Sequence, residues 1–536
     1  MADTTRRHLT AGLGAAAMGL ALPAGPARAQ AEAPRRGGTL TMAVADEPLS
    51  LVTLATTAAS AVILSGKVTE GLLAYDFDLN PRPQLATEWS VSPDGLRLTF
   101  RLRQGVRWHD GRDFTADDVA FSLMTLKRVH PRGQSTFQNL ERVETPDPHT
   151  AILVLSRPAP YLLGGLVACE SPIVPRHAYA AAGNAVATSP NEAAPVGTGP
   201  FRFREWARGR HVIYERNPDY WGGGDRPYID RLIVRFVADA ASRAIGLETG
   251  EIDLAGWSPV PLNDVRRLSA LPHLVVETRG NEYQNNLFYR IEFNLENRYL
   301  SNERVRRAVA HAIDRNVLLN VVFLGYGVVA NGPISPNLRA FHDAALPPIP
   351  FDLRRAEALL EEAGLPRGAD GVRFRLMVDA QAGPQSGIAQ YLRSSLRRIG
   401  VDVTVRTEDV GAYVRRVYTD RNFDLTAQGS TQMYDPTVGT QRFYWSRNFR
   451  PGVPYSNGAR YASPEADRAL EAAAVEIDPA ARRAEFARFQ RQVMADLPAV
   501  GLVAQSQITV ANRRVMDHTT TADGVSANFA EVYLRA

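Results

Sequence analysis

Apolar residues between positions 373 and 427 recur with the period of a strand in three segments and with the period of a helix in the two segments between them, which predicts three strands and two helices. RFRLMVD, VDVTV and NFDLTAQ alternate apolar with polar residues, as half-buried strands do. QYLRSSLRRIG places Leu392, Leu396 and Ile399 on one face of a helix, and VGAYVRRVYTD is predicted to form the second helix. The β-α-β-α-β order favours a mostly parallel sheet with helices on its faces. Ligands bind beyond the carboxyl ends of strands in such sheets, so the segment GSTQMYDPT is a candidate wall of a binding site.

The same patterns extend an α/β organisation along the rest of the chain. Residues 38–44 and 96–102 alternate as strands, and residues 302–323 are predicted to form one amphipathic helix. Thr115, followed three residues later by Asp118, is predicted to cap the helix ADDVAFSLMTLKRV. No internal repeat and no low-complexity run interrupts this organisation.

The stretch PVGTGPFRFREWARG, residues 195–209, predicts a constrained turn that leads into a strand. Pro195 and Pro200 fix φ, and Gly197 and Gly199 are expected to adopt backbone angles that are closed to other residues. The following FRFREW alternates aromatic with charged residues, as a half-buried strand does. An ordinary tight entry into a sheet is the preferred interpretation of this stretch, and a functional loop is the alternative.

Length and charge narrow the class of protein. A chain of 536 residues is too long for a single hydrophobic core, so two or three domains are expected. A hydrophobic content of 45% with 22% charged residues is typical of globular proteins. The formal net charge is only +4 and no basic cluster concentrates it, so a nucleic-acid partner is not expected.

Residues 1–29 are predicted to be a secretion signal. A charged start precedes a short apolar run, and the A-x-A motif before Gln30 marks a cleavage site near Ala29. The pair Arg6-Arg7 is similar to a twin-arginine signal, although ordinary secretion stays open. The apolar run is too short for a permanent membrane anchor. We therefore expect a freely diffusing periplasmic protein.

The sequence carries no motif of a known catalytic or metal centre. It lacks G-x-S-x-G, H-E-x-x-H and the phosphate-binding G-x-x-x-x-G-K-[ST] motif, and no two of its 10 histidines lie within one helical turn. His109-Asp110 is predicted to belong to a turn rather than to a catalytic dyad, and the lone Cys169 is predicted to be a small buried residue. We expect no enzyme activity, no cofactor and no resident metal. A secreted hydrolase is the alternative.

Several landmarks occur in an order that identifies a family. Together they closely resemble the family 5 extracellular solute-binding proteins of bacterial ABC importers, over essentially the whole chain after the signal. The landmarks are RGGTLTMAVADEPLSL, VTEGLLAYD, LATEWSVSPDGLRLTFRLRQGVRWHDGRDFTADDVAFS, VGTGPFRF, ERNPDYWGG and NERVRRAVAHAIDR.

The resemblance implies a two-lobed α/β periplasmic binding protein fold, with mixed sheets flanked by helices and an extra domain. By motif, the first lobe comprises residues 36–50, 172–280 and 505–536. Residues 51–171 form the inserted extra domain, and residues 281–504 form the second lobe. Crossings near 280 and 504 are expected to act as the hinge. VGTGPF is a structural signature in this family, which favours the structural interpretation of that turn.

The resemblance also implies the function and the partners. The chain is expected to be a monomeric solute-binding subunit that captures a peptide-like or other medium polar solute by lobe closure. It would deliver this solute to a membrane permease powered by an ATPase. A secreted enzyme on the same fold, or an accessory that hands ligand to a receptor, would be the competing classes.

The GSTQMYDPT segment departs from the family's peptide binders. Those proteins carry an aspartate three residues before the D/E-P pair, where it anchors the peptide amino terminus, whereas this chain has Gln432 before Asp435-Pro436. A neutral amide supplies no counter-charge to a buried ammonium group. The substitution favours an opine, a sugar-phosphate conjugate or a glutathione-like solute over a free-amine peptide, and a chelated metal is a further alternative. Asp435 is either a ligand contact or a turn residue before Pro436.

Further residues are predicted to line the ligand site. The aromatic candidates stack on a ligand or pack within a lobe, and the guanidinium of Arg460 binds a carboxylate or phosphate or lies solvated on the surface. With Gln432 and Asp435, the predicted contacts are Glu47, Tyr434, Trp445, Tyr455 and Arg460.

Overall fold

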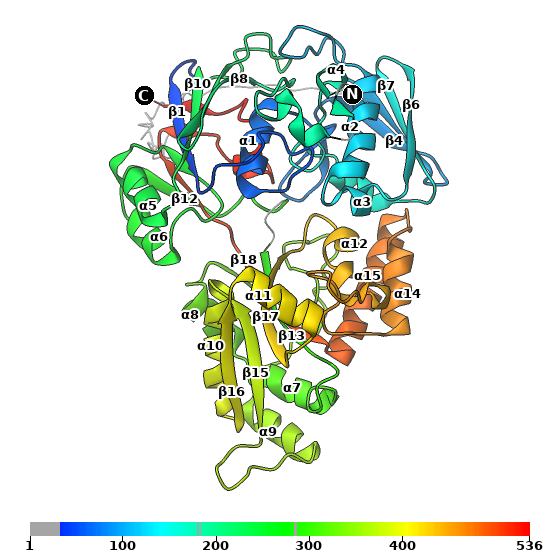
Figure 1. Ribbon diagram of the computed structural model, residues 1–536, viewed down its shortest axis with the longest axis vertical. Coiled ribbons are helices and arrows are strands. Elements are labelled where there is room, and N and C mark those ends of the chain that lie inside the picture. Colours follow the sequence, from blue (N-terminus) through cyan, green and yellow to red (C-terminus); the bar gives the residue numbers. More distant parts are fainter. Residues whose placement is uncertain (1–32, 180–181, 184, 284–286, 536) are drawn as a thin grey trace, which may run out of the picture. The chain divides into compact units, whose positions relative to one another are not determined.

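The computed structural model describes residues 33–179, 182–183, 185–283 and 287–535. The predicted secretion signal, residues 1–29, lies outside the described residues. Residues from Arg35 onward form one compact unit that contains three larger sheets (Figure 1).

The first sheet has seven strands and combines parallel with antiparallel pairing. β1 lies in its centre, parallel to both β10 and β11, and the remaining neighbours are antiparallel. Helices α5 (Ala240–Thr249) and α6 (Leu262–Ser269) pack with one set of its apolar residues, and α1 (Ala59–Val68) packs with another. In spatial order the strands are β12 (Leu274–Glu277), β19 (Thr509–Asn512), β11 (Leu254–Ala255), β1 (Thr39–Val44), β10 (Arg231–Phe236), β9 (His211–Arg216) and β8 (Phe201–Ala207).

The second sheet has six strands and contains the predicted β-α-β-α-β unit. β15 pairs parallel with both β16 and β17, as predicted, whereas β13 is antiparallel to β17 and β18. The sheet is therefore mixed rather than mostly parallel. In order the strands are β14 (Gly327–Val329), β18 (Ala499–Gln505), β13 (Leu287–Phe293), β17 (Leu425–Thr431), β15 (Phe374–Gln381) and β16 (Val401–Glu408).

Helices of the second sheet differ from the prediction at two places. The single helix expected over 302–323 is two helices, because the Asp314 carboxylate accepts hydrogen bonds from the amides of Asn316 and Val317 and starts a new helix. The helix predicted from VGAYVRRVYTD begins as α11 and continues as a π-helix. The helices around this sheet are α7 (Glu303–His311), α8 (Arg315–Val322), α9 (Leu353–Glu362), α10 (Pro384–Arg397), α11 (Val410–Val414) and the π-helix η5 (Arg415–Asp420).

The third sheet is four-stranded and antiparallel, in the order β4-β5-β7-β6. Helix α2 (Ala116–Val129) packs against it, and the predicted cap is confirmed, because the amide of Thr115 donates to the Asp118 carboxylate at 3.0 Å. Its strands are β4 (Ala86–Val91), β5 (Arg97–Leu102), β7 (Thr150–Leu155) and β6 (Leu140–Asp147).

Shorter elements complete the chain. Helices α14 (Pro464–Ala473) and α15 (Pro479–Asp496) pair with each other. The remaining elements are β2 (Leu73–Tyr75), β3 (Pro81–Pro83), α3 (Gly133–Thr136), η1 (Pro160–Gly165), α4 (Arg176–Tyr179), η3 (Val186–Thr188), η4 (Pro190–Glu192), α12 (Pro436–Gly439), α13 (Gln441–Tyr444), η6 (Ser446–Asn448), β20 (Val515–Met516), η7 (Gly524–Ser526) and β21 (Tyr533–Leu534). The lobe and domain boundaries given above stay predictions.

The VGTGPF turn needs its glycines for space rather than for backbone angle. Neither Gly197 nor Gly199 has a positive φ, so the expected special backbone angles are wrong. A Cβ on Gly197 would lie 2.0 Å from the carbonyl oxygen of Val68, and one on Gly199 would lie 2.6 Å from the same atom. The turn therefore lies against the end of α1, where no side chain fits.

His109 is part of this packing. Its Nδ1 accepts a hydrogen bond from the Gly197 amide at 3.2 Å, and its Nε2 lies 2.9 Å from the Gly199 carbonyl oxygen. Burial lowers the pKa of His109 to about 4. Asp110 contacts His177 instead, at 2.6 Å. This arrangement supports the turn interpretation of the WHDG segment over the dyad.

Candidate functional site

A cavity of about 390 Å³ lies at the carboxyl ends of β1 and β11. The residues that follow these two strands line it, together with the start of α1. Leu287, the first residue of β13, and Gln505, the last residue of β18, add a wall from the second sheet. The carboxyl ends of parallel strands are where α/β sheets bind ligands, so this cavity is the candidate solute site.

Trp257 and Ser258 form a strained part of the cavity wall. Both have positive φ angles, 60° and 55°, which non-glycine residues rarely adopt. The Ser258 amide donates to the Ile508 carbonyl at 2.8 Å, and its hydroxyl donates to the side chain of Gln507 at 3.1 Å, so this conformation is held in place. The indole N–H of Trp257 is buried and has no acceptor among the described residues. The wall thus presents an unused hydrogen-bond donor.

Arg442, which follows β17, carries a positive charge that no carboxylate among the described residues compensates. One of its terminal nitrogens donates to the carbonyl oxygen of Thr431 at 3.3 Å, and its Nε has no partner among the described residues. Within the described part of the chain, no carboxylate forms an ion pair with it. Burial, with the like charge of Arg290 nearby, lowers the pKa of Arg442 to about 10. A bound anion would remove this penalty.

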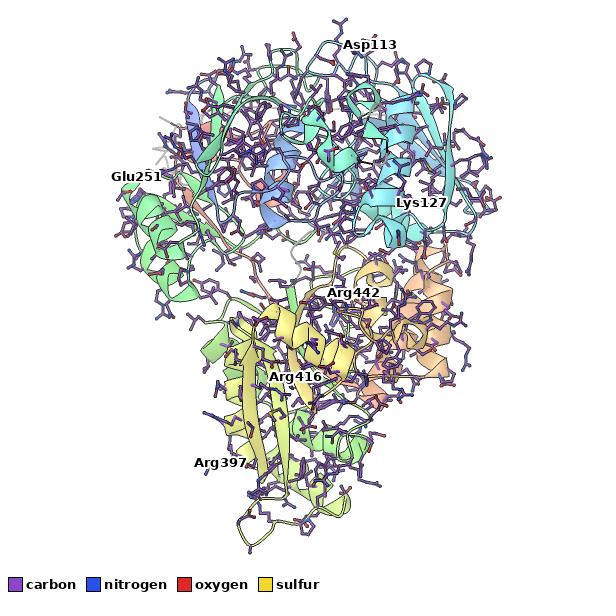
Figure 2. The ribbon with its side chains drawn as sticks, viewed as in Figure 1. Asp113, Lys127, Glu251, Arg397, Arg416 and Arg442 are labelled. Carbon is purple, nitrogen blue, oxygen red and sulfur yellow. The ribbon has the colours of Figure 1, made fainter. Side chains whose placement is uncertain are left out.

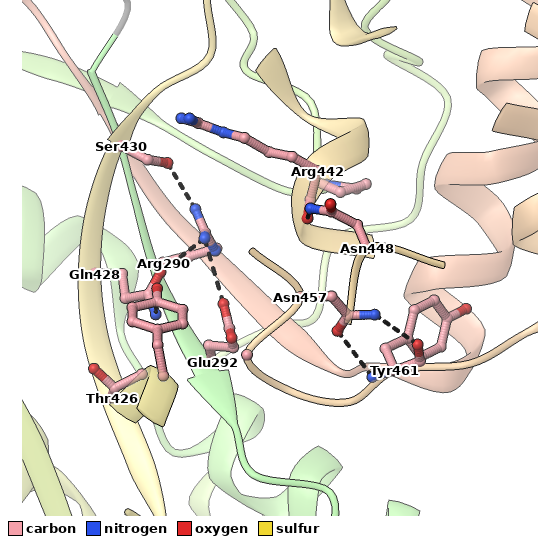
Figure 3. Close-up of polar contacts among 12 residues, drawn as sticks. Arg290, Glu292, Thr426, Gln428, Ser430, Arg442, Asn448, Asn457 and Tyr461 are labelled. Atoms are coloured by element: carbon pink, nitrogen blue, oxygen red, sulfur yellow. Dashed lines mark hydrogen bonds and ion pairs between the residues drawn. The ribbon is translucent and has the colours of Figure 1, made fainter. Parts of the chain in front are cut away.

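Arg290, in contrast, is neutralised inside the second sheet. Its guanidinium donates to Ser430 at 2.7 Å and to Gln428 at 2.8 Å, and it lies 3.3 Å from the Glu292 carboxylate (Figure 3). Burial raises the pKa of Glu292, although the positive charge of Arg290 opposes this shift. Of these two neighbouring arginines, Arg442 is therefore the one without a carboxylate partner among the described residues.

Strand pairing connects Arg442 to the cavity. Leu287, which lines the cavity, is the cross-strand partner of Thr431, whose carbonyl binds the Arg442 guanidinium. Paired strands lie about 5 Å apart. Asp46 is the one acidic side chain among the described residues that line the cavity. The cavity can thus offer an indole N–H and a carboxylate to a polar solute, and the guanidinium of Arg442 contacts Thr431, one strand away from the cavity residue Leu287.

The three predicted residues of the GSTQMYDPT segment are occupied by protein contacts. The Gln432 amide accepts from the Ser335 amide and donates to the Pro333 carbonyl, both at 2.7 Å. Tyr434 is buried and stacks on Tyr283, with ring centroids 5.2 Å apart. Asp435 receives two hydrogen bonds from Arg482, at 2.7 and 2.9 Å, and caps α12 by accepting from the Thr437 amide at 2.8 Å.

The other four predicted residues also have protein partners. The Glu47 carboxylate accepts from Trp206 and from the Gly209 amide, and the Trp445 indole donates to Glu471, each at 2.9 Å. The Arg460 guanidinium forms an exposed ion pair with Glu296. The Tyr455 hydroxyl accepts from Gln381 at 3.1 Å, and its ring lies 5.7 Å from that of Tyr418, which accepts from Gln428.

None of the seven predicted residues lines the cavity. Of the seven, only Tyr455 contacts Tyr418, which is connected to Arg290 through Gln428. A direct ligand contact by any of them stays a prediction. Sequence reasoning did not select Trp257, Asp46 or Arg442. Arg442 lies in the QRFYWS segment that supplied Trp445, but no local pattern shows that its charge is unpaired.

Two negative findings apply to the described residues. No group of three or more histidine, cysteine, aspartate or glutamate side chains among them is placed to hold a metal ion. None of the helices they form is both long and apolar enough to span a bilayer.

The chain is similar in sequence to a known protein family and to characterised proteins. Residues 80–452 match the model of bacterial extracellular solute-binding proteins, family 5 middle region. Di/tripeptide-binding protein 2 of Pseudomonas aeruginosa is 30% identical over 448 residues, which cover 78% of this chain and 80% of the relative.

Solved structures share the fold. The ABC transporter-associated periplasmic binding protein DppA from Helicobacter pylori, in complex with the peptide STSA, superposes with a TM-score of 0.74 at 27% identity, covering 94% of this chain and 99% of that one. The binding protein AgaA from A. tumefaciens R10, in complex with agropinic acid, gives a TM-score of 0.72 at 27% identity, covering 93% and 99%.

Proposed function

Because the chain belongs to the family 5 bacterial extracellular solute-binding proteins, the solute-binding components of ABC importers, we propose that it carries a polar solute bearing a carboxylate or similar anionic group. The resemblance, the α/β two-lobed fold class and the transport function predicted from the sequence are confirmed. Members of this family are transporter components rather than enzymes, and we propose that this chain likewise binds its solute without turnover.

The observation that carries the proposal is the partly buried guanidinium of Arg442, whose Nε is buried and has no partner among the described residues. A buried charge without a counter-ion is costly, and removing that cost upon ligand binding converts into affinity. Guanidinium groups bind carboxylates bidentately through short, charge-assisted hydrogen bonds. Arg442 contacts Thr431, the cross-strand partner of the cavity residue Leu287, so an anionic group that extends from the cavity past Leu287 would meet it.

The remaining groups of the site support a solute with further polar atoms. The Trp257 indole would donate to an acceptor on the solute, and Asp46 would accept from a hydroxyl or an amine. Gln432 is committed to Pro333 and Ser335, so it would not serve as an amine anchor. The first candidates are the solutes in the names of relatives: a di- or tripeptide, agropinic acid, and glutathione, which a glutathione-binding protein of Salmonella typhimurium that is 27% identical over 455 residues binds; all of them present a carboxylate.

The finer features of the transport role belong to the same proposal. Residues 281–504 would close on the remainder of the chain about the crossings near 280 and 504, and the closed complex would dock on an inner-membrane permease. A ligand favours closure only through contacts that it makes in the closed state. We place the mature protein in the periplasm, as a monomer, after cleavage of the signal near Ala29.

The test is calorimetric titration of the purified full chain with trialanine, N-acetyl-trialanine, trialanine amide, glutathione and agropinic acid. We expect binding to require a free carboxylate, and N-acetylation to change affinity by less than about threefold. Hydrogen bonds to charged groups contribute about 1.5–3 kcal/mol, so Arg442→Gln should weaken binding about 10- to 150-fold. Arg450→Gln, an exposed arginine eight residues later, is the matched control and should have no effect.

Two results would contradict the proposal. Equal affinity of the Arg442→Gln and unchanged proteins for every solute that binds would remove Arg442 from the site. A requirement for a free amine, with indifference to the carboxylate, would restore a peptide-amine binder and point to Asp46 instead.

A further inference from the structure

A second cavity, of about 470 Å³, shares no lining residue with the candidate solute site. One wall is the β4–β5 hairpin with η1, and the other is the turn between α14 and α15 with residues 340–341. The walls are mainly apolar. Six of the side chains that carry this character are Val91, Leu98, Leu163, Phe341, Ile477 and Pro479.

The two walls touch at the hairpin turn but leave apolar surface exposed to solvent. A Cβ added to Gly95 would lie 2.8 Å from Cγ2 of Ile477, so the hairpin turn packs directly on the α14–α15 turn. Val91 and Ile477 are nevertheless 43% and 42% exposed, which leaves apolar surface at the opening. Large apolar side chains that face water around a cavity are typical of a site that receives an apolar ligand.

Two arginines, Arg482 and Arg483, line this cavity, and only Arg482 has an ion-pair partner among the described residues. Arg482 is buried, and the ion pair with Asp435 compensates its charge. Arg483 is exposed and lines the cavity, and it has no ion pair or side-chain hydrogen bond among the described residues. The cavity therefore combines an apolar interior with one uncompensated positive charge.

We propose that this cavity is a second binding site, for an amphiphile with an apolar chain or ring and one anionic end. Its volume falls within the 300–1,000 Å³ range of small-molecule sites and exceeds the apolar cavity of about 150 Å³ that holds benzene. The apolar part would lie between Leu163, Phe341 and Ile477, and the anionic end would face Arg483. This inference does not depend on the solute proposed for Arg442.

Occupancy of this site would also affect the conformation of the protein. Its walls come from residues 91–163 and 340–483, two stretches that the sequence places in different domains. A ligand that contacts both walls binds only when they face each other, so it favours that arrangement.

The experiment is fluorescence titration of the full chain with 8-anilinonaphthalene-1-sulfonate, an aromatic anion of suitable size, followed by competition with decanoate. We expect one saturable site that decanoate empties and that octylamine does not. Exposed charge pairs contribute about 0.2–1 kcal/mol, so Arg483→Gln should weaken both anions about 1.4- to fivefold. Arg397→Gln, an exposed arginine at the end of α10 (Figure 2), should leave both unchanged.

Blocking variants test the location of the site. Ala340 and Val91 are exposed residues on opposite walls, so a tryptophan at either position fills the opening without disturbing the core. Ala340→Trp and Val91→Trp should each reduce dye binding at least tenfold, while Arg442→Gln should not change it. Unchanged dye binding in both folded blocking variants, or dye binding that only the solute of the Arg442 site displaces, would overturn the proposal.

Discussion

The ion pair between Asp435 and Arg482 offers the sharpest test of how the candidate wall is built. Both side chains are buried, with exposed fractions of 6% and 7%, and two hydrogen bonds of 2.7 and 2.9 Å join them. Asp435→Asn removes the charge and keeps an oxygen that can still accept from the Thr437 amide. Arg482 would then be a buried charge without a counter-ion.

The cost follows from what Arg482 retains. Removing one member of a buried ion pair costs about 3–5 kcal/mol. Arg482 keeps acceptors in the Ala473 carbonyl, at 2.8 Å, and the Thr437 hydroxyl, at 3.0 Å, so we expect the lower end of that range. At about 2.1 cal/mol/K per residue, a loss of about 3 kcal/mol lowers the melting temperature of a chain of this length by about 3 °C.

Urea unfolding followed by circular dichroism measures this loss, and a double-mutant cycle identifies its source. Arg482→Met alone leaves the Asp435 carboxylate buried and should be similarly destabilising, whereas the double variant removes both charges and should recover at least half of the loss. If Asp435→Asn unfolds within about 0.5 kcal/mol of the unchanged protein and loses solute binding, then Asp435 is a ligand contact and the structural reasoning is refuted.

Three further predictions follow from other sites. Gly197→Ala should cost about 2 kcal/mol or more in urea unfolding, because its Cβ would overlap the Val68 carbonyl; an unchanged midpoint would show that the turn can move away from α1. Trp257→Phe should weaken solute binding about 2- to 12-fold with little change in stability, because it deletes one hydrogen-bond donor; an unchanged affinity in calorimetry would remove the indole from the site. Burial raises the pKa values of Glu70 and Asp523 to about 7, so the folded state holds these protons more tightly than the unfolded chain; the stability that these two carboxyl groups contribute is lost as the pH rises from about 4.5 to 7, whereas the lowered pKa of His109 acts in the opposite direction. Compared with the unchanged protein, Asp523→Asn should lose this contribution, so its free energy of unfolding should fall less, or rise more, between pH 5 and 7; the same pH dependence of both proteins in urea titrations at pH 5, 6 and 7 would contradict the assignment.

Much of the fold was predictable because local patterns follow local geometry. The alternation in RFRLMVD, VDVTV and NFDLTAQ is the period of a strand, and those segments are the parallel strands β15, β16 and β17. Thr115 and Asp118 are three residues apart, so their capping contact depends on nothing beyond the helix itself. The antiparallel partner β13 was not predictable in this way, because it pairs with residues more than 130 positions away.

The break between α7 and α8 shows where periodicity misleads. Apolar spacing continues across residues 302–323, so it predicts a single helix. Asp314 instead caps a new helix, and its amide and carbonyl also bind the hydroxyl of Tyr391, which lies 77 residues later. A distant contact thus competes with the helical hydrogen bond at this position.

The sequence by itself determined the family, the function class and the segments that form the sheets, because these depend on residue order and on periodicity. Only the tertiary structure decided which polar side chains at the site are buried and which of their charges have an ion-pair partner. Asp435 and Arg442 are seven residues apart and carry opposite charges, yet one is neutralised by Arg482 and the other has no carboxylate partner among the described residues. The physical reason is that burial and ion pairing are set by neighbours from other parts of the chain, and these neighbours decide whether a charge stabilises the protein or is left for a solute.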